Sequence, residues 1–329
     1  MKVLFIGGSG IISSACSALA AERGIDLYLL NRGRTTHRAI PDAAKLLVGD
    51  IRDPAVADVL AGHTFDVVVD WVAFTTEHVA TDLALFRGRV GQYVFISSAS
   101  AYQKPPQHLP ITEETPLENP FWEYSRNKIA CETYLLAAYH DKSFPVTIVR
   151  PSHTYDQTLL PFRGDYTIID RIRRGKPLLI HGDGTSLWTL THHRDFARAF
   201  VPLLGEPRAI GEAFHITSDE WLTWNEIAHL LGEAAGAEAV LAHVPSETVA
   251  RYDEDWGDSL LGDKSHCAIF DNSKIRGIVP DFAATIPFAE GAREIVAWYD
   301  ANPEAQRVGT YFDEQMDRII AAQAAVRPA

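Results

Sequence analysis

The sequence has few cysteines, a shortage of positive charge and no long apolar run. Its three cysteines, Cys16, Cys131 and Cys267, are far apart and form no metal-binding cluster, so we expect reduced thiols and no metal site. A net charge of −13 disfavours a surface that binds nucleic-acid phosphates. No stretch approaches the roughly 20 apolar residues of a membrane-spanning helix, and the apolar run before Gly7 is too short for a signal peptide. These absences predict a soluble, cytoplasmic protein that binds neither membranes nor nucleic acid.

Short apolar runs that alternate with helical stretches are abundant. The 329 residues, 47% of them apolar, have room for one large or two medium domains. Each run is continuous, as in strands that are buried on both faces of a parallel sheet. The runs are residues 3–6, 27–30, 46–48, 67–73, 92–98 and 146–151. This pattern predicts an α/β fold with a doubly wound parallel sheet and ligands at the carboxyl ends of its strands.

A glycine-rich turn over residues 7–13 follows the first run and leads into an alanine-rich helix. Glycines at such a turn let backbone N–H groups approach a pyrophosphate at the positive end of a helix. A plain tight turn is the alternative. We predict that the turn binds a dinucleotide through Gly7, Ser9, Gly10, Ile11 and Ile12.

The end of the second run bears on the choice of cofactor. An acidic residue there would bind a ribose 2′-hydroxyl and repel a 2′-phosphate. This chain instead has Asn31, Arg32 and Arg34. Arginine suits a phosphate, so NADP is favoured over NAD, unless both arginines are solvated loop charges. Asp50, after the third run, could accept from an adenine amino group or cap a helix.

Residues 95–128 hold the side chains that predict chemistry. The run 92–98 ends on Ser97 and Ser98, while Tyr124 and Lys128 are four apart and share one face of a predicted helix. An ammonium beside a phenol lowers the pKa of the phenol, which could then exchange a proton near neutral pH. Such a pair also arises by chance, as a half-buried tyrosine with a solvated lysine. The serine-ended strand and the glycine turn favour a hydride-transfer site.

The regular alternation stops after Pro151. Beyond it come a strand over 214–218, a capping box formed by Thr223 and Glu226, and helices that end near Tyr299 and span 313–326. We predict a dinucleotide-binding domain over 1–155, to which a strand and a helix near 190–205 return. A smaller C-terminal α/β substrate domain is predicted over 156–329.

These motifs, with Gly49-Asp50, Tyr102, Arg150-Pro151 and residues 182–195, resemble the extended short-chain dehydrogenase/reductase superfamily, in its NAD-dependent epimerase/dehydratase branch. Residues 31–33 and 217–225 are most similar to the group that contains chloroplast stem-loop-binding proteins. The resemblance implies a Rossmann-type domain and a homodimer. It implies that Tyr124 is the general acid/base, Lys128 its pKa-lowering and ribose-binding partner, and Ser98 the hydroxyl that orients the substrate oxygen. Further implied cofactor contacts are Asp50, Ile51, Trp71, Val72, Ala73, Ser97 and Pro151.

The chain departs from the family pattern where the substrate binds. Dehydratases carry Asp-Glu at the positions of Ala99-Ser100, so sugar dehydration is not expected. Trp188 stands where an arginine commonly grips a nucleotide-sugar diphosphate, and offers a stacking face instead. His153 replaces a substrate-binding asparagine, and Ser13 replaces the third glycine of the turn, which predicts looser helix–strand packing. The substrate contacts that the resemblance implies are Ser98, Ser100, Tyr102, His153 and Trp188.

The function expected from the sequence is hydride transfer at a hydroxyl-bearing carbon of a sugar or sugar derivative by an NAD(P)-dependent oxidoreductase or epimerase. One alternative is an RNA-binding protein of the stem-loop-binding type, which the acidic net charge opposes. The other is a dinucleotide sensor without turnover, which the retained Tyr124 opposes.

Overall fold

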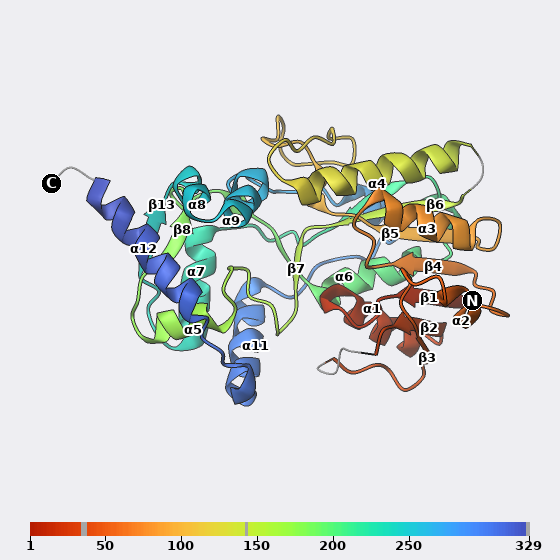
Figure 1. Ribbon diagram of the computed structural model, residues 1–329, viewed down its shortest axis with the longest axis horizontal. Helices are drawn as coiled ribbons and strands as arrows, with labels where there is room; N and C mark the ends of the chain where they lie inside the picture. Colours follow the sequence, from red (N-terminus) through yellow and green to blue (C-terminus); the bar gives the residue numbers. More distant parts are fainter. Residues whose placement is uncertain (34–37, 142–143, 327–329) are drawn as a thin grey trace.

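The computed structural model describes residues 1–33, 38–141 and 144–326. Two parts lie side by side along the long axis of the molecule (Figure 1). The part that carries the N-terminus is built on a large sheet. The other part contains mostly helices and carries the C-terminal helix.

The sheet has seven parallel strands in the order β11-β6-β5-β4-β1-β2-β3. Their bounds are β1 (Lys2–Ile6), β2 (Asp26–Asn31), β3 (Lys45–Val48), β4 (Val67–Asp70), β5 (Gln92–Ile96), β6 (Val146–Pro151) and β11 (Ala213–Ile216). Ile6 pairs with both Leu30 and Asp70, so neighbouring strands end at one level. Strand order reverses between β1 and β4, which is where a doubly wound sheet opens a ligand crevice. The predicted fold class is confirmed.

Helices cover both faces of this sheet. On one face, α1 (Ile11–Glu22) and α6 (His193–Phe200) pack over Phe5, Leu27 and Val69; on the other, α2, α3 and α4 pack over Leu4, Val68 and Phe95. Alternate strand residues therefore enter opposite cores, and both sets are apolar as a doubly covered sheet requires. The second set of helices is α2 (Val56–Val59), α3 (Thr76–Phe86) and α4 (Glu123–His140).

The glycine turn is compact, with Ser13 as an integral member. Gly7 has φ +86°, and a Cβ there would lie 2.5 Å from Val72 Cγ1. The buried Ser13 hydroxyl donates to the Gly7 carbonyl (2.8 Å) and accepts from the Gly10 N–H (2.8 Å). Ser13 in place of the third glycine predicts looser packing of the helix on the strand. In the structure its hydroxyl instead links Gly7 and Gly10 of the turn through two hydrogen bonds. A third glycine could not make these two bonds.

The C-terminal part packs around Trp224, Ile227 and Leu231 of α7 (Trp224–Ala235), which starts at the predicted Thr223–Glu226 capping box. Its other elements are β7 (His153–Tyr155), α5 (Tyr166–Arg173), β8 (Leu178–His181), β9 (Leu187–Trp188), β10 (Leu190–His192), β12 (Leu222–Thr223), β13 (Leu241–Val244), α8 (Ser246–Tyr252), α9 (Glu254–Ser259), α11 (Phe288–Ala301) and α12 (Thr310–Val326). Helix α10 (Ser273–Ile278) packs instead on the large sheet, where Ile275 joins the core beneath α1 and α6. No helix in the described part of the chain is long and apolar enough to cross a membrane. The domain boundaries stay a prediction.

Candidate active site

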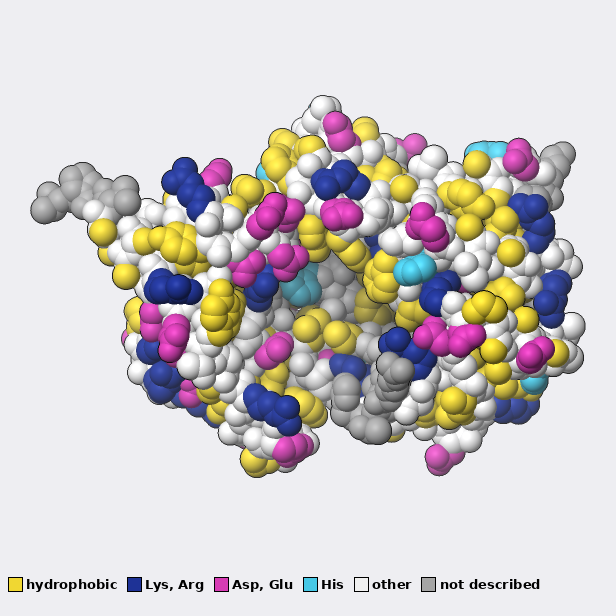
Figure 2. Space-filling model, in the orientation of Figure 1, with side chains coloured by type: hydrophobic (Ala, Val, Ile, Leu, Met, Phe, Trp, Pro, Cys, Tyr) yellow, Lys and Arg dark blue, Asp and Glu magenta, His cyan; other side chains and the backbone are white. Residues whose placement is uncertain are grey.

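A cavity of about 440 Å³ lies between the carboxyl ends of the strands and the C-terminal part, where the surface is hollowed in Figure 2. The sheet part contributes the glycine turn, the ends of β4 and β5, and the start of α4. The C-terminal part contributes β7, β9 and the helical turn Leu260–Lys264. Predicted site residues that line the cavity are Gly7, Gly10, Ile11, Ile12, Trp71, Val72, Ser97, Ser98, Ser100, Tyr124, Lys128, Pro151, His153 and Trp188.

Lys128 is buried one helical turn after Tyr124. Its ammonium donates to the carbonyls of Ala73 (2.7 Å) and Ile96 (2.8 Å), at the ends of β4 and β5. Burial lowers the pKa of Lys128 to about 8. Because an ammonium has three protons, one remains for a ribose hydroxyl. Ala73 thus takes part through its carbonyl, by holding Lys128.

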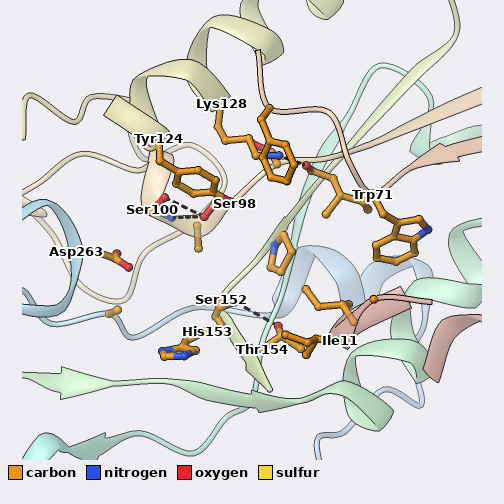
Figure 3. A pocket seen from close by; sticks show the side chains of 18 of the residues that line it. Ile11, Trp71, Ser98, Ser100, Tyr124, Lys128, Ser152, His153, Thr154 and Asp263 are labelled. Carbon is orange, nitrogen blue, oxygen red and sulfur yellow. Dashed lines mark hydrogen bonds between the residues drawn. The ribbon is translucent and has the colours of Figure 1, made fainter. Parts of the chain in front are cut away.

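Tyr124 points its phenol toward Ser98 (Figure 3). Burial raises the pKa of Tyr124 to about 12; the Ser98 hydroxyl acts in the opposite direction, and the Asp263 carboxylate adds to the increase. Lys128 Nζ is 5.8 Å from the centre of the Tyr124 ring. The predicted lowering of this pKa by Lys128 is not found, since the ammonium is committed to two carbonyls while the phenol is desolvated.

The serines at the end of β5 have separate roles. Ser98 faces the cavity and its Oγ lies 2.9 Å from Ser100 Oγ. Ser97 donates to the buried Glu132, which also holds Arg150 through Arg150 Nη2 (2.6 Å). This ion pair fixes β5, β6 and α4 against one another behind Ser98.

A second groove, of about 460 Å³, shares Gly7, Gly10, Val72 and Phe74 with the cavity and runs over the ends of β2 and β3. Predicted residues Ser9, Asn31, Arg32, Asp50 and Ile51 also line it. The continuous groove, the close backbone at Gly7 and the start of α1 fit a dinucleotide. Arg32 Nη1 lies 3.9 Å from Asp50 and its side chain is 59% exposed. Arg34 lies outside the described residues.

Tyr102 and Trp188, two of the predicted substrate contacts, do not present open faces to the cavity. Tyr102 is fully buried and does not line the cavity; its hydroxyl bonds to Arg150 Nη1 (3.2 Å) and His215 Nδ1 (3.0 Å). It is a structural link between β6 and β11, because those buried partners use its only polar group. Trp188 lines the cavity but is 3% exposed, with its ring 5.3 Å from Trp224, so it does not present an open stacking face.

His153 is fixed in one tautomer. The Trp188 indole N–H donates to His153 Nδ1 (3.1 Å), so the ring proton is on Nε2. Burial lowers the pKa of His153 to about 3, so the ring is neutral. His153 is thus a neutral hydrogen-bond donor at the cavity wall.

Sequence reasoning missed the charged residues of the C-terminal wall. Asp263 and Lys264 line the cavity from the turn after α9, and the buried Lys104 ammonium lies 3.4 Å from Asp263. Lys264 Nζ lies 5.4 Å from the Trp122 ring centre and 4.0 Å from Asp263. No motif marks these residues, since only the packing of the turn against loop 103–122 brings them to the site.

Known proteins resemble the chain in sequence and fold. A family model described as the NAD dependent epimerase/dehydratase family matches residues 78–217. The 2′-dehydrokanamycin reductase of Streptomyces kanamyceticus is 27% identical over 86% of this chain and 80% of that protein. The dTDP-glucose 4,6-dehydratase of Streptomyces niveus is 28% identical over 92% of this chain and 94% of that protein. The chloroplast stem-loop binding protein of 41 kDa b of Arabidopsis thaliana is 27% identical over 71% of this chain and 63% of that protein.

Two solved structures share the fold. An epimerase from Methanothermobacter thermautotrophicus has a TM-score of 0.77, 20% identity, and coverage of 93% of this chain and 94% of its own. A UDP-glucuronic acid 4-epimerase from Bacillus cereus, solved with UDP-glucuronic acid and NAD, has a TM-score of 0.73, 20% identity, and coverage of 92% and 99%. The fold and site define an enzyme of the extended short-chain dehydrogenase/reductase type. Within that class, the chain is similar to the NAD-dependent epimerase/dehydratase family, whose model matches residues 78–217.

Proposed function

We propose that the protein interconverts a hydroxyl and a carbonyl group on a sugar or sugar derivative, with a nicotinamide dinucleotide as hydride carrier. The convergence of Ser98, Tyr124 and Lys128 on a cavity that continues into the dinucleotide-type groove carries this proposal. The bound nicotinamide would accept or supply the hydride. Tyr124 would exchange a proton with the substrate oxygen, Ser98 would hydrogen-bond that oxygen, and Lys128 would hold the ribose.

A protonated Tyr124 suits its use as the general acid in the reduction of a carbonyl group. With its pKa raised by burial to about 12, Tyr124 holds its proton near neutral pH. A protonated phenol can give that proton to the oxygen of a carbonyl group as it becomes a hydroxyl. The similarity to a reductase supports the same direction.

The C-terminal wall supports a polar substrate with an anionic group. Lys264 lines the cavity beside Asp263, and the buried Lys104, outside the lining, lies 3.4 Å from the same carboxylate. These two ammonium groups exceed the charge of Asp263, and a buried positive charge is stabilised by an anion. His153 Nε2–H is a further donor for a substrate oxygen. For the cofactor, the exposed Arg32 supports NADP as the preferred form. The family implies a homodimer, which stays a prediction.

The test begins with the protein as purified. It is denatured, any released nicotinamide is identified, and emptied protein is titrated with NADH and NADPH by fluorescence. The loaded protein is then given UDP-glucose, UDP-glucuronic acid and 2′-dehydrokanamycin, which relatives act on or bind. Cofactor retained through purification would indicate epimerase chemistry, whereas exchangeable binding with NADPH preferred would indicate a reductase. Binding of neither cofactor would reject the proposal.

RNA binding is the second candidate, because one relative is a stem-loop binding protein. The net charge of −13 opposes it. Salt-dependent affinity for a stem-loop RNA in a protein that binds no cofactor would favour this candidate.

A further inference from the structure

Three serine hydroxyls form a continuous chain that ends at the cavity. Ser125 Oγ donates to Ser100 Oγ (2.8 Å), and Ser100 Oγ lies 2.9 Å from Ser98 Oγ. Ser100 and Ser125 are 4% and 0% exposed, whereas Ser98 faces the cavity beside Tyr124 (Figure 3). The chain joins the turn after β5 to the first turn of α4.

The direction of these hydrogen bonds follows from proton counting. Ser125 gives its only hydroxyl proton to Ser100, so the Ser100–Ser98 contact needs a proton from one of those two residues. If Ser98 supplied it, the Ser100 proton would have no protein acceptor among the described residues and could only point into the cavity, which the 4% exposed Ser100 lines. The arrangement that leaves no Ser100 proton unpaired has Ser100 donating to Ser98. Ser98 Oγ also accepts from the Ser100 N–H (3.1 Å), so both its lone pairs are used and its own proton is directed to the cavity side, where the Tyr124 phenol is its partner in the absence of substrate.

We propose that Ser100 and Ser125 are positioning residues that make Ser98 a hydrogen-bond donor only, directed at the oxygen of the reacting substrate carbon. This rests on the proposed function and changes the role predicted for Ser100 from substrate contact to support of Ser98. A donor suits an oxygen that gains negative charge when hydride arrives or a proton leaves. The row of serine hydroxyls ends at the buried Ser125, so it carries no proton to solvent. Its effect is to fix which of the serine oxygens donates and which accepts each hydrogen bond.

The test removes one oxygen at a time with Ser100→Ala, Ser125→Ala and the double variant. The Ser100 carbonyl accepts from Asn119 Nδ2 (2.9 Å), which also bonds to the Gly262 carbonyl (2.6 Å), so the backbone stays held when the hydroxyl is lost. On the probe sugar that wild-type protein turns over, we expect kcat to fall about 3- to 10-fold in each variant, with KM and cofactor affinity unchanged. The double variant should lose no more than a single one, because either change breaks the same chain.

Matched variants separate polarity from packing. Ser100→Thr and Ser100→Val add similar bulk, but only Ser100→Thr keeps a hydroxyl. Its kcat should therefore be higher than that of Ser100→Val. Ser246→Ala breaks a hydroxyl pair with Ser265 (2.6 Å) outside the cavity lining and should change nothing. Unchanged kcat in both single variants, or additive losses in the double variant, would overturn the proposal.

A measurement without substrate keeps this test independent of the proposed function. NMR of ring-labelled tyrosine, assigned with Tyr124→Phe, follows ionisation of Tyr124 as pH rises while circular dichroism reports the fold. Because a donating Ser98 stabilises the phenolate, Ser100→Ala should delay that ionisation to higher pH, and Ser246→Ala should not. No delay would overturn the proposal even if no substrate were found, whereas a delay in a protein without turnover would reject only the proposed function.

Discussion

The two walls of the cavity are built differently. On the sheet side, Ser98, Tyr124 and Lys128 lie at the ends of regular elements. Lys128 is held by the carbonyls of Ala73 and Ile96, and Ser98 by the Ser100 hydroxyl. On the C-terminal side, Asp263 and Lys264 lie on a short turn whose Lys264 carbonyl is held by His181 Nε2 and Ser186 Oγ (2.9 Å each). One wall is fixed by secondary structure, the other by side chains that hold a turn.

From this difference we expect the sheet wall to serve the reaction and the C-terminal wall to serve the choice of substrate. In the proposed function, the sheet wall would position the groups that act on a hydroxyl-bearing carbon, because strand ends meet at one level whatever the substrate. The C-terminal wall lies on a turn outside the sheet, so a change in its charge leaves the sheet in place. We therefore expect variants of the sheet wall to change turnover and variants of the other wall to change substrate affinity.

The largest effect is expected from Tyr124→Phe. Without the phenolic proton, kcat should fall about 10²- to 10⁴-fold while cofactor affinity stays within a few-fold. Steady-state kinetics and a cofactor titration measure both. Full activity would disprove the general-acid role and with it the assignment of chemistry to the sheet wall.

Gly7→Ala is expected next, because it combines two costs. The alanine would adopt φ +86° and place Cβ 2.5 Å from Val72 Cγ1, so unfolding free energy should fall by about 2–4 kcal/mol and cofactor binding should weaken. Gly24→Ala is the control, since Gly24 has φ +73° but open space around it, and should cost only about 1–2 kcal/mol with normal binding. Denaturant unfolding and fluorescence titration measure these. Equal effects of the two variants would contradict a close approach at Gly7.

Lys264→Met tests the division between the walls directly. It keeps the length of the side chain and removes the charge, so KM for an anionic probe sugar should rise about 10-fold with kcat nearly unchanged. Lys274→Met, at a lysine paired with Glu212 outside the cavity, is the control. A loss in kcat instead of KM would assign chemistry to the C-terminal wall.

The attachment of α12 to α5 should depend on pH. Burial alone would raise the pKa of Asp313, but hydrogen bonds from Lys176 (3.0 Å) and the buried Arg171 lower it to about 2. A lowered pKa gives stability that is present above the unfolded value of about 4 and is lost as pH falls through about 2. Asp313→Asn should therefore destabilise by about 1–2 kcal/mol at neutral pH and much less near pH 2. Unfolding curves at both pH values measure this, and a pH-independent difference would exclude the ion pairs as its cause.

The smallest effect is expected from Arg32→Ala. The side chain is mostly exposed, so its loss should weaken NADPH binding about 3- to 10-fold and leave NADH binding unchanged. Arg208→Ala, at an exposed arginine paired with Glu206, is the control. Equal weakening of both cofactors would show that Arg32 does not distinguish them.

Much of the sheet wall was predictable because its rules are local. The spacing of Tyr124 and Lys128, the serine-ended strand and the glycine turn each depend on periodicity or backbone freedom within a few residues. The pKa of Tyr124 was not predictable in this way. It depends on how far the phenol is desolvated and on the carbonyls that hold Lys128, which come from the loop after β4 and from the end of β5.

The sequence by itself determined the doubly wound sheet and the turn over residues 7–13, because hydrophobic period and strand–helix order fix where strand ends lie. It also predicts Ser98, Tyr124 and Lys128 as the reactive side chains. Only the tertiary structure decided that Tyr102 is buried between β6 and β11 and that Trp188 is covered by Trp224. It also decided that Asp263 and Lys264 complete the cavity lining. These outcomes depend on contacts between residues far apart in the chain. Such contacts leave no periodic signal in the sequence.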